Sequence, residues 1–237
     1  PTPSVVGIAE EYDGSSWTES GDLNTARYNL AGFGIQTAGF GVAGDATLVV
    51  AETYNGSSWT ETGDINTGRN ALAGAGTTAA AIVFGGTPGG KDETELWNGS
   101  SWTEVNDLNT GRRQVGGVGT STAGLCFGGG PGTKNETEEF DGTSWSEQNN
   151  LNTARNSVAG SGIQTAALAF GGSTNRTEKY DGTSWTETSD LSTSRSSLGG
   201  SPAGTQGTAL AFAGTPPITN ATEEFSTGVG TETISFD

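Results

Sequence analysis

The chain has 237 residues, a formal net charge of −17 at pH 7 and hydrophobic residues at 31%, with 40 glycines and no histidine. This acidic balance argues against nucleic-acid binding and against an acidic membrane surface as partner, because both need clustered Lys and Arg. One cysteine, Cys126, and no histidine exclude a disulfide framework and a zinc site. No stretch approaches the roughly 18 apolar residues of a membrane-spanning helix. We therefore expect no metal, no cofactor and no membrane insertion.

One segment of the sequence recurs five times. Its tryptophans are separated by 42, 43, 43 and 40 residues, and its arginines keep the same intervals. The tryptophans are Trp17, Trp59, Trp102, Trp145 and Trp185, and the arginines are Arg27, Arg69, Arg112, Arg155 and Arg195. Two unrelated markers with one period predict a structural unit of about 42 residues. We expect the tryptophans to pack between adjacent units and the arginines to make structural hydrogen bonds or ion pairs.

The unit that begins at Arg155 predicts four strands in chain order. A strand of small residues at 156–162 is followed by a short apolar strand at 165–170, which ends in a double glycine. A third strand at 177–180 alternates polar and apolar residues, an Asp-Gly turn follows, and the fourth strand covers 184–188. Each unit then closes with Asp-Leu-Asn-Thr or a near variant, whose side chains favour a turn into the next unit.

Four short antiparallel strands per unit predict a blade of a β-propeller, so the fold class is all-β. Residues 1–237 then form a single propeller. Its blade-sized repeats lie at about 27–62, 69–104, 112–147, 155–188 and 195–237, and the strand pair at 5–20 serves as closure or as extra strands. The last unit lacks its Trp and ends in an alternating segment at 231–236. We favour five blades, with six as the alternative, because six third-strand aromatics accompany only five first-and-second strand pairs.

Two resemblances follow from these motifs. The Phe-Gly-Gly at 84–86, 127–129 and 170–172, followed by an aromatic, a Trp and an Arg, resembles the kelch repeat. The kelch repeat implies a propeller, although the aromatic and the Trp are closer together here. The Asp-Gly-Thr-Ser-Trp and Leu-Asn-Thr-Ala-Arg motifs are similar to repeat arrays in structural proteins of marine bacteriophages, such as tail-fibre or appendage-like proteins. That resemblance implies a virion or cell-surface appendage.

Most of the acidic residues also belong to the repeat. Five glutamates stand two places after the Trp, and six stand two places before the preceding aromatic: Glu10, Glu52, Glu95, Glu138, Glu178 and Glu223. Strand-face carboxylates and cross-strand ion pairs explain this pattern better than an acidic active site does. No Asp or Glu pair stands outside the repeat, yet the residue types still allow a polysaccharide hydrolase that uses two carboxylates.

The candidate ligand site lies where the units differ. The loops between the second and third strands diverge, and antiparallel connectivity places them on one face together with the turns between units. The predicted ligand-binding residues are Lys91, Asp92, Lys134, Asn135, Asn175, Arg176 and Asn220. Neutral drift in exposed loops is the competing explanation.

The sequence thus predicts a non-enzymatic module for extracellular recognition or adhesion, on a phage virion or a cell surface. Its partner would be a cell-surface glycan or a protein. One alternative is a purely structural domain that docks onto neighbouring virion or surface proteins. Another is a polysaccharide hydrolase, while the ligand, the source and the oligomeric state are left open.

Overall fold

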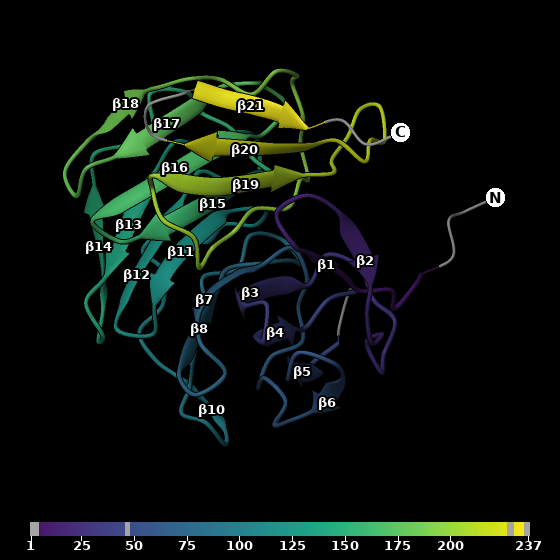
Figure 1. Cartoon of the computed structure of the whole chain (residues 1–237). Coiled ribbons are helices and arrows are strands. Elements are labelled where there is room, and N and C mark those ends of the chain that lie inside the picture. The colour runs from purple at the N-terminus through teal and green to yellow at the C-terminus, as the bar shows by residue number, and fades with distance from the viewer. Residues whose placement is uncertain (1–4, 46–47, 227–229, 235–237) are drawn as a thin grey trace.

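The computed structural model describes residues 5–45, 48–226 and 230–234, and every regular element within these ranges is a β-strand. No helix in them is long and apolar enough to cross a membrane. The strands form separate antiparallel sheets that follow one another around a ring, in the arrangement of a β-propeller (Figure 1).

Four of these sheets are complete four-stranded blades. The first contains β3 (Ala31–Ile35), β4 (Ala38–Val42), β5 (Ala51–Tyr54) and β6 (Trp59–Glu61), and the second contains β7 (Ala73–Gly76), β8 (Ala81–Phe84), β9 (Thr94–Trp97) and β10 (Trp102–Glu104). The third contains β11 (Gly116–Thr120), β12 (Ala123–Phe127), β13 (Thr137–Phe140) and β14 (Trp145–Gln148), and the fourth contains β15 (Val158–Ile163), β16 (Ala166–Gly171), β17 (Thr177–Tyr180) and β18 (Trp185–Glu187). Neighbouring first strands contact one another, so they surround the centre of the ring.

The predicted number of blades is wrong. The structure has four four-stranded blades among its described residues, and not the five that we favoured or the six of the alternative. The fifth unit forms a three-stranded sheet of β19 (Thr208–Phe212), β20 (Thr222–Ser226) and β21 (Gly230–Ile234). The N-terminal pair, β1 (Glu10–Tyr12) and β2 (Trp17–Glu19), forms a sheet of two strands. Of the predicted strand at 231–236, the last two residues lie outside the described ranges.

The fifth unit lacks its first strand, and its sequence differs there by Pro202 and by two extra residues between Arg195 and Phe212. The four complete blades carry a glycine seven residues after the repeat arginine, and its φ is positive: Gly34 (106°), Gly76 (115°), Gly119 (108°) and Gly162 (111°). The fifth unit has Pro202 at this place, and the proline ring fixes φ near −65°. The first strand is reduced to an isolated bridge between Gly199 and Phe212.

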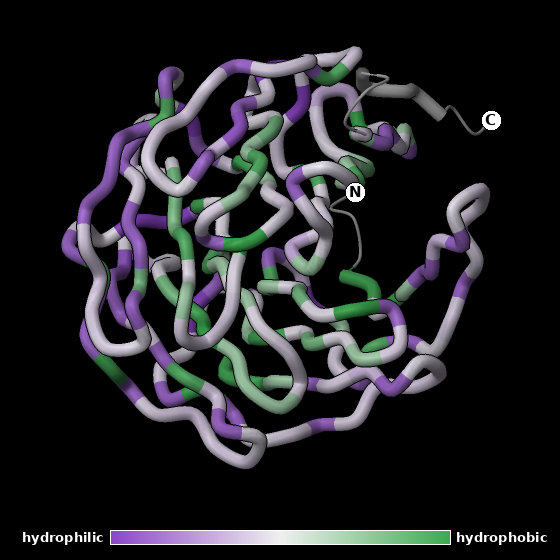
Figure 2. The backbone as a smooth tube through the Cα atoms, turned by 60° about the vertical axis from the view of Figure 1, so that its left-hand side comes forward, coloured by the Kyte–Doolittle hydropathy of each residue, from purple (hydrophilic) through white to green (hydrophobic). Residues whose placement is uncertain are grey.

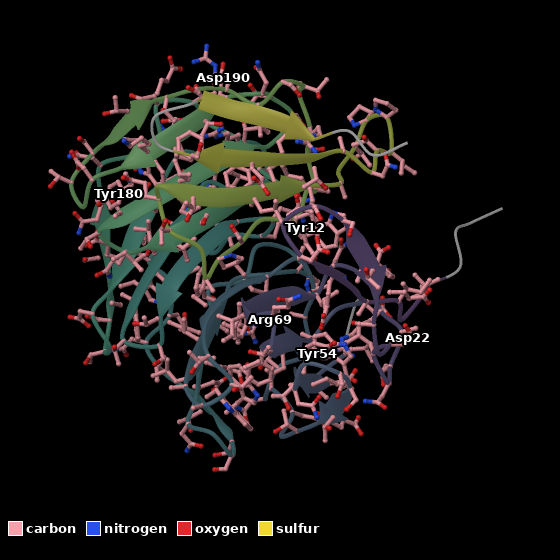
Figure 3. All side chains as sticks on the ribbon, viewed as in Figure 1. Tyr12, Asp22, Tyr54, Arg69, Tyr180 and Asp190 are labelled. Carbon is pink, nitrogen blue, oxygen red and sulfur yellow. The ribbon has the colours of Figure 1, made fainter. Side chains whose placement is uncertain are left out.

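The two-stranded sheet lies between the three-stranded sheet and the first blade. The Tyr12 hydroxyl donates to Glu224 at 3.1 Å and the Trp17 indole N–H to Thr222 at 3.0 Å. On the other side, the Tyr54 hydroxyl of the first blade donates to Glu11. Figure 3 labels Tyr12 in the two-stranded sheet and Tyr54 in the first blade. Figure 2 shows the backbone of the sheets following one another around the ring. Within the described part of the chain, β2 is the only strand that pairs with β1.

The apolar core is divided into four clusters, each between two neighbouring sheets. The repeat tryptophans take part in these interfaces. Trp145 lies edge-on to Phe84 of the preceding blade, with ring centroids 4.8 Å apart, and Trp185 lies edge-on to Phe127 at 5.1 Å. The repeat tryptophans of the second, third and fourth blades thus each contact an aromatic ring of the blade before them.

Candidate functional site

Each repeat arginine is buried and pairs with the third-strand glutamate of the same unit. The side chains of all five pairs are at most 2% exposed. The pairs are Arg27–Glu52, Arg69–Glu95 (2.7 Å), Arg112–Glu138 (2.7 Å), Arg155–Glu178 (3.0 Å) and Arg195–Glu223. The guanidinium groups also donate to main-chain carbonyls, as Arg112 does to Gly128 at 2.9 Å and to Glu136 at 2.7 Å. These arginines tie strands together within the scaffold.

Burial and pairing act in opposite directions on the charges of these pairs. Desolvation would raise the pKa of Glu52, but hydrogen bonds from Arg27 and Asn24 outweigh it and hold the pKa below its usual value. Desolvation lowers the pKa of Arg155. The ion pair therefore depends on close hydrogen bonding, as expected for charges that have left water.

The predicted loop-face residues lie where the sequence places them, beside the turns between units. Their main chains have a repeated role, since the carbonyls of Asp92, Asn135 and Asn175 accept from the leucines that close their units: Leu108 at 3.0 Å, Leu151 at 2.9 Å and Leu191 at 2.8 Å. Asn220 is in the matching loop of the fifth unit. The divergent loops thus share one backbone function.

The basic side chains of that face are already engaged. Lys91 pairs with Glu93, Lys134 pairs with Glu136 at 3.1 Å, and Arg176 pairs with Glu187. A ligand would compete with a carboxylate in its own unit at each of these positions. The prediction of ligand binding at this face stays a prediction.

A different feature emerges at the centre of the ring. A cavity of about 660 Å³ is lined by the first-strand segments of all five units and, on one side, by the N-terminal hairpin. Among its lining residues Glu10 is the only charged one, and most of the others are apolar residues and glycines. The cavity extends between β1 and β3, past Ala9, Glu10, Gly32 and Trp59. We call this side of the cavity the seam.

Glu10 differs from its five counterparts. They are buried and paired with arginine, whereas Glu10 is exposed and no ion pair is recorded for it in the described ranges. An arginine at the matching place would precede a first strand, and the two-stranded sheet has none. The seam therefore contains a carboxylate without the partner that its position has elsewhere.

Strand β1 also has a free edge. Among the strands that the structure describes, β1 pairs with β2 alone, whereas β5, β9, β13 and β17 each lie between two strands. Ser20 donates to the Ala9 carbonyl and Asp13 to that of Ser16, so the alternation of an antiparallel pair turns the N–H groups of Glu10 and Tyr12 away from β2. These groups face the seam side of the hairpin.

Gly32 shows what the seam lacks. In the later units the same position is covered by the preceding blade: a Cβ on Gly117 would lie 2.7 Å from the Phe84 ring, and one on Gly160 would lie 2.6 Å from the Phe127 ring. A Cβ on Gly32 would meet no atom of the described residues within 4 Å. A position adapted to an aromatic ring is therefore empty in the first blade.

Trp59 and Gln36 are altered in the same way. Trp59 has no ring contact with a preceding sheet, and its indole N–H is buried without a hydrogen-bond partner in the described part of the chain. Gln164 donates to two main-chain carbonyls of the blade before it, at 3.0 and 2.8 Å. Gln36, at the equivalent place, donates to the Glu11 side chain at 3.3 Å and to no main-chain carbonyl of the described residues. Both residues are adapted to a neighbouring second strand.

The seam was not predicted from the sequence, because Glu10 has the same place in its unit as the five paired glutamates. The signal was present, since six glutamates keep the third-strand position but only five arginines keep the repeat position that pairs with it. The five observed pairs identify Glu10 as the remaining one.

The described residues offer little other site chemistry. Cys126 is buried, and desolvation raises its pKa to about 12, which leaves the thiol protonated. No group of three or more His, Cys, Asp or Glu within the described ranges could hold a metal ion.

Comparison with known proteins adds no relative. No protein-family model matches the chain, and a search of curated proteins gives no match either. The propeller arrangement of four-stranded antiparallel blades therefore stands on the structure alone.

Proposed function

We propose that this chain is a non-enzymatic recognition module that binds a protein partner at the seam. The observation that supports it is the combination of a 660 Å³ cavity with the free edge of β1. An exposed strand edge offers main-chain N–H and C=O groups in register, which suits a polypeptide better than a sugar. The apolar lining adds surface that a partner would bury.

We propose that the module belongs to a virion or cell surface, and the support for this is the resemblance of its repeats to kelch repeats and to those of phage structural proteins. Strand addition at the seam would serve recognition of a host protein, and it would serve attachment to a neighbouring structural protein equally well. A polysaccharide hydrolase is less favoured because such enzymes use two carboxyl groups, and the cavity lining supplies Glu10 alone.

A displayed random-peptide library tests this proposal. Peptides selected on the protein are re-tested on Gly32→Trp, whose indole would enter the seam at a position with free space for a side chain. The control combines Lys91→Ala, Lys134→Ala and Arg176→Ala on the loop face. We expect Gly32→Trp to abolish binding of the selected peptides and the loop-face variant to retain it. A cooperative thermal unfolding transition of each variant shows that both are folded. Peptides that bind Gly32→Trp as well as the original protein would overturn the proposal.

A further inference from the structure

We propose that the seam accepts an antiparallel β-hairpin from a separate polypeptide, with an arginine that pairs with Glu10 and an aromatic side chain that packs on Gly32 and Trp59. The inference rests on the proposed binding at the seam and specifies the partner. Its basis is internal: the complete blades show what their first two strands provide at the positions that are empty here.

The backbone of the seam defines the docking geometry. In the third blade, β13 pairs with β12 so that Glu138 faces Cys126 and Phe140 faces Gly124. Glu10 and Tyr12 are the matching residues of β1, and their N–H groups are directed toward the unoccupied side. An incoming strand would continue the sheet antiparallel to β1, and a second strand would fill the place that β11 has in the third blade.

The charge of the seam selects arginine. A hairpin that covered Glu10 without a cation would bury a lone carboxylate, which is strongly unfavourable. In the third and fourth blades the arginine pairs with the glutamate and also donates to the carbonyl two residues before it, as Arg112 does to Glu136 and Arg155 does to Arg176. The Ile8 carbonyl stands at that place in the N-terminal hairpin. The planar guanidinium can reach both groups, while lysine offers a single point charge.

The apolar part of the seam selects an aromatic. Phe84 lies against Trp145 of the next blade and over Gly117. Gly32 corresponds to Gly117 and Trp59 corresponds to Trp145, but no described phenylalanine has the place of Phe84 beside them. A ring at the end of the second strand of the incoming hairpin would complete it and would cover the Trp59 side chain.

A second copy of this chain is a poorer occupant. Pairing β1 with the β1 of another copy would bring Glu10 and Glu11 against the same acidic residues, and like charges on paired strands are destabilising. The acidic edge thus favours a partner of opposite charge over self-association.

The chain supplies its own probe. A fluorescent peptide with the sequence of residues 155–172 contains the repeat arginine, both inner strands and the second-strand phenylalanine. We expect saturable binding by fluorescence anisotropy. Arg155→Gln in the peptide and Glu10→Gln in the protein should each weaken binding by at least about tenfold, and together no further, because each removes the same ion pair. Phe170→Ala in the peptide should also weaken binding.

A fusion keeps the test decisive if the free peptide is too disordered to bind. Joining residues 155–172 to the N-terminus through a flexible linker raises the effective concentration of the hairpin to the millimolar range. We expect a higher melting temperature than that of the unfused protein, and a smaller rise in the Glu10→Gln fusion. A fusion whose melting temperature is no higher than that of the unfused protein would overturn the inference. Dimers of the unfused protein in size-exclusion chromatography that persist in Glu10→Gln would also overturn it. Library peptides that bind the seam without arginine would refute the hairpin partner and leave the proposed function standing.

Discussion

The complete blades and the seam present the same residues in two environments. Glu138 is buried and paired with Arg112 at 2.7 Å, whereas Glu10, at the same place in its unit, is exposed. Gly117 is covered by the Phe84 ring, whereas Gly32 has free space above it. The difference lies in the neighbouring strands, since the residues themselves are the same. Repeat residues thus act as scaffold where their neighbours are present and become site residues where they are not.

The ion pairs give the sharpest contrast. Glu138→Gln should lower the free energy of unfolding by about 3–5 kcal/mol, because it leaves the Arg112 charge buried without its partner. Glu10→Gln should change it by less than about 0.5 kcal/mol, as an exposed substitution does. Urea denaturation of both variants measures the difference. Equal losses would show that Glu10 is as well integrated as its counterparts.

The two glycines should respond to alanine with opposite signs. Gly117→Ala places a Cβ 2.7 Å from the Phe84 ring and 2.8 Å from the Ala73 Cβ, so we expect a loss of about 1–3 kcal/mol. Gly32→Ala meets no atom and reduces the freedom of the unfolded chain, so we expect a gain of up to about 1 kcal/mol. Melting temperatures under identical conditions compare the pair. A loss in Gly32→Ala like that in Gly117→Ala would contradict the open seam.

The tryptophans allow a smaller gain to be tested. The Trp145 indole N–H donates to the hydroxyl of Thr94 at 3.0 Å. Ala9 stands at the place of Thr94 beside Trp59, and its side chain has no hydroxyl to accept from the Trp59 indole N–H. Ala9→Thr should supply that acceptor and stabilise the protein by about 0.5–1.5 kcal/mol. Ala9→Val, of similar shape without the hydroxyl, is the control. Equal effects of Thr and Val would mean that the indole gains no hydrogen bond.

The repeat made much of the fold readable from the sequence. The period and the strand alternation predicted four-stranded antiparallel units, and the observed β15 to β18 begin and end within two residues of the predicted strands. The number of blades was not predictable in the same way. It depends on the segment around Pro202, which is two residues longer than in the complete blades and has a proline seven residues after the repeat arginine. The complete blades have a glycine with positive φ at that place, and this requirement is visible only in the folded backbone.

The site was harder to predict for a related reason. The sequence shows that Glu10 matches Glu52 and Glu138, but it does not show that the first two strands of its sheet are missing from the space beside it. Divergence drew attention to Lys91, Lys134 and Arg176, whose side chains the structure pairs with glutamates. The seam consists of repeat residues such as Glu10 and Gly32. The arginine and the aromatic ring that their counterparts contact in the complete blades are missing beside them in the described part of the chain.

Hydrogen exchange of individual amides tests the central claim most directly. The N–H groups of Glu10 and Tyr12 face the free edge of β1, while those of Glu138 and Phe140 face β12 in a complete blade. We expect rapid exchange at Glu10 and Tyr12 and strong protection at Glu138 and Phe140. Addition of the hairpin peptide should then protect Glu10 and Tyr12. Protection of Glu10 and Tyr12 in the protein alone, equal to that of Glu138 and Phe140, would contradict the account.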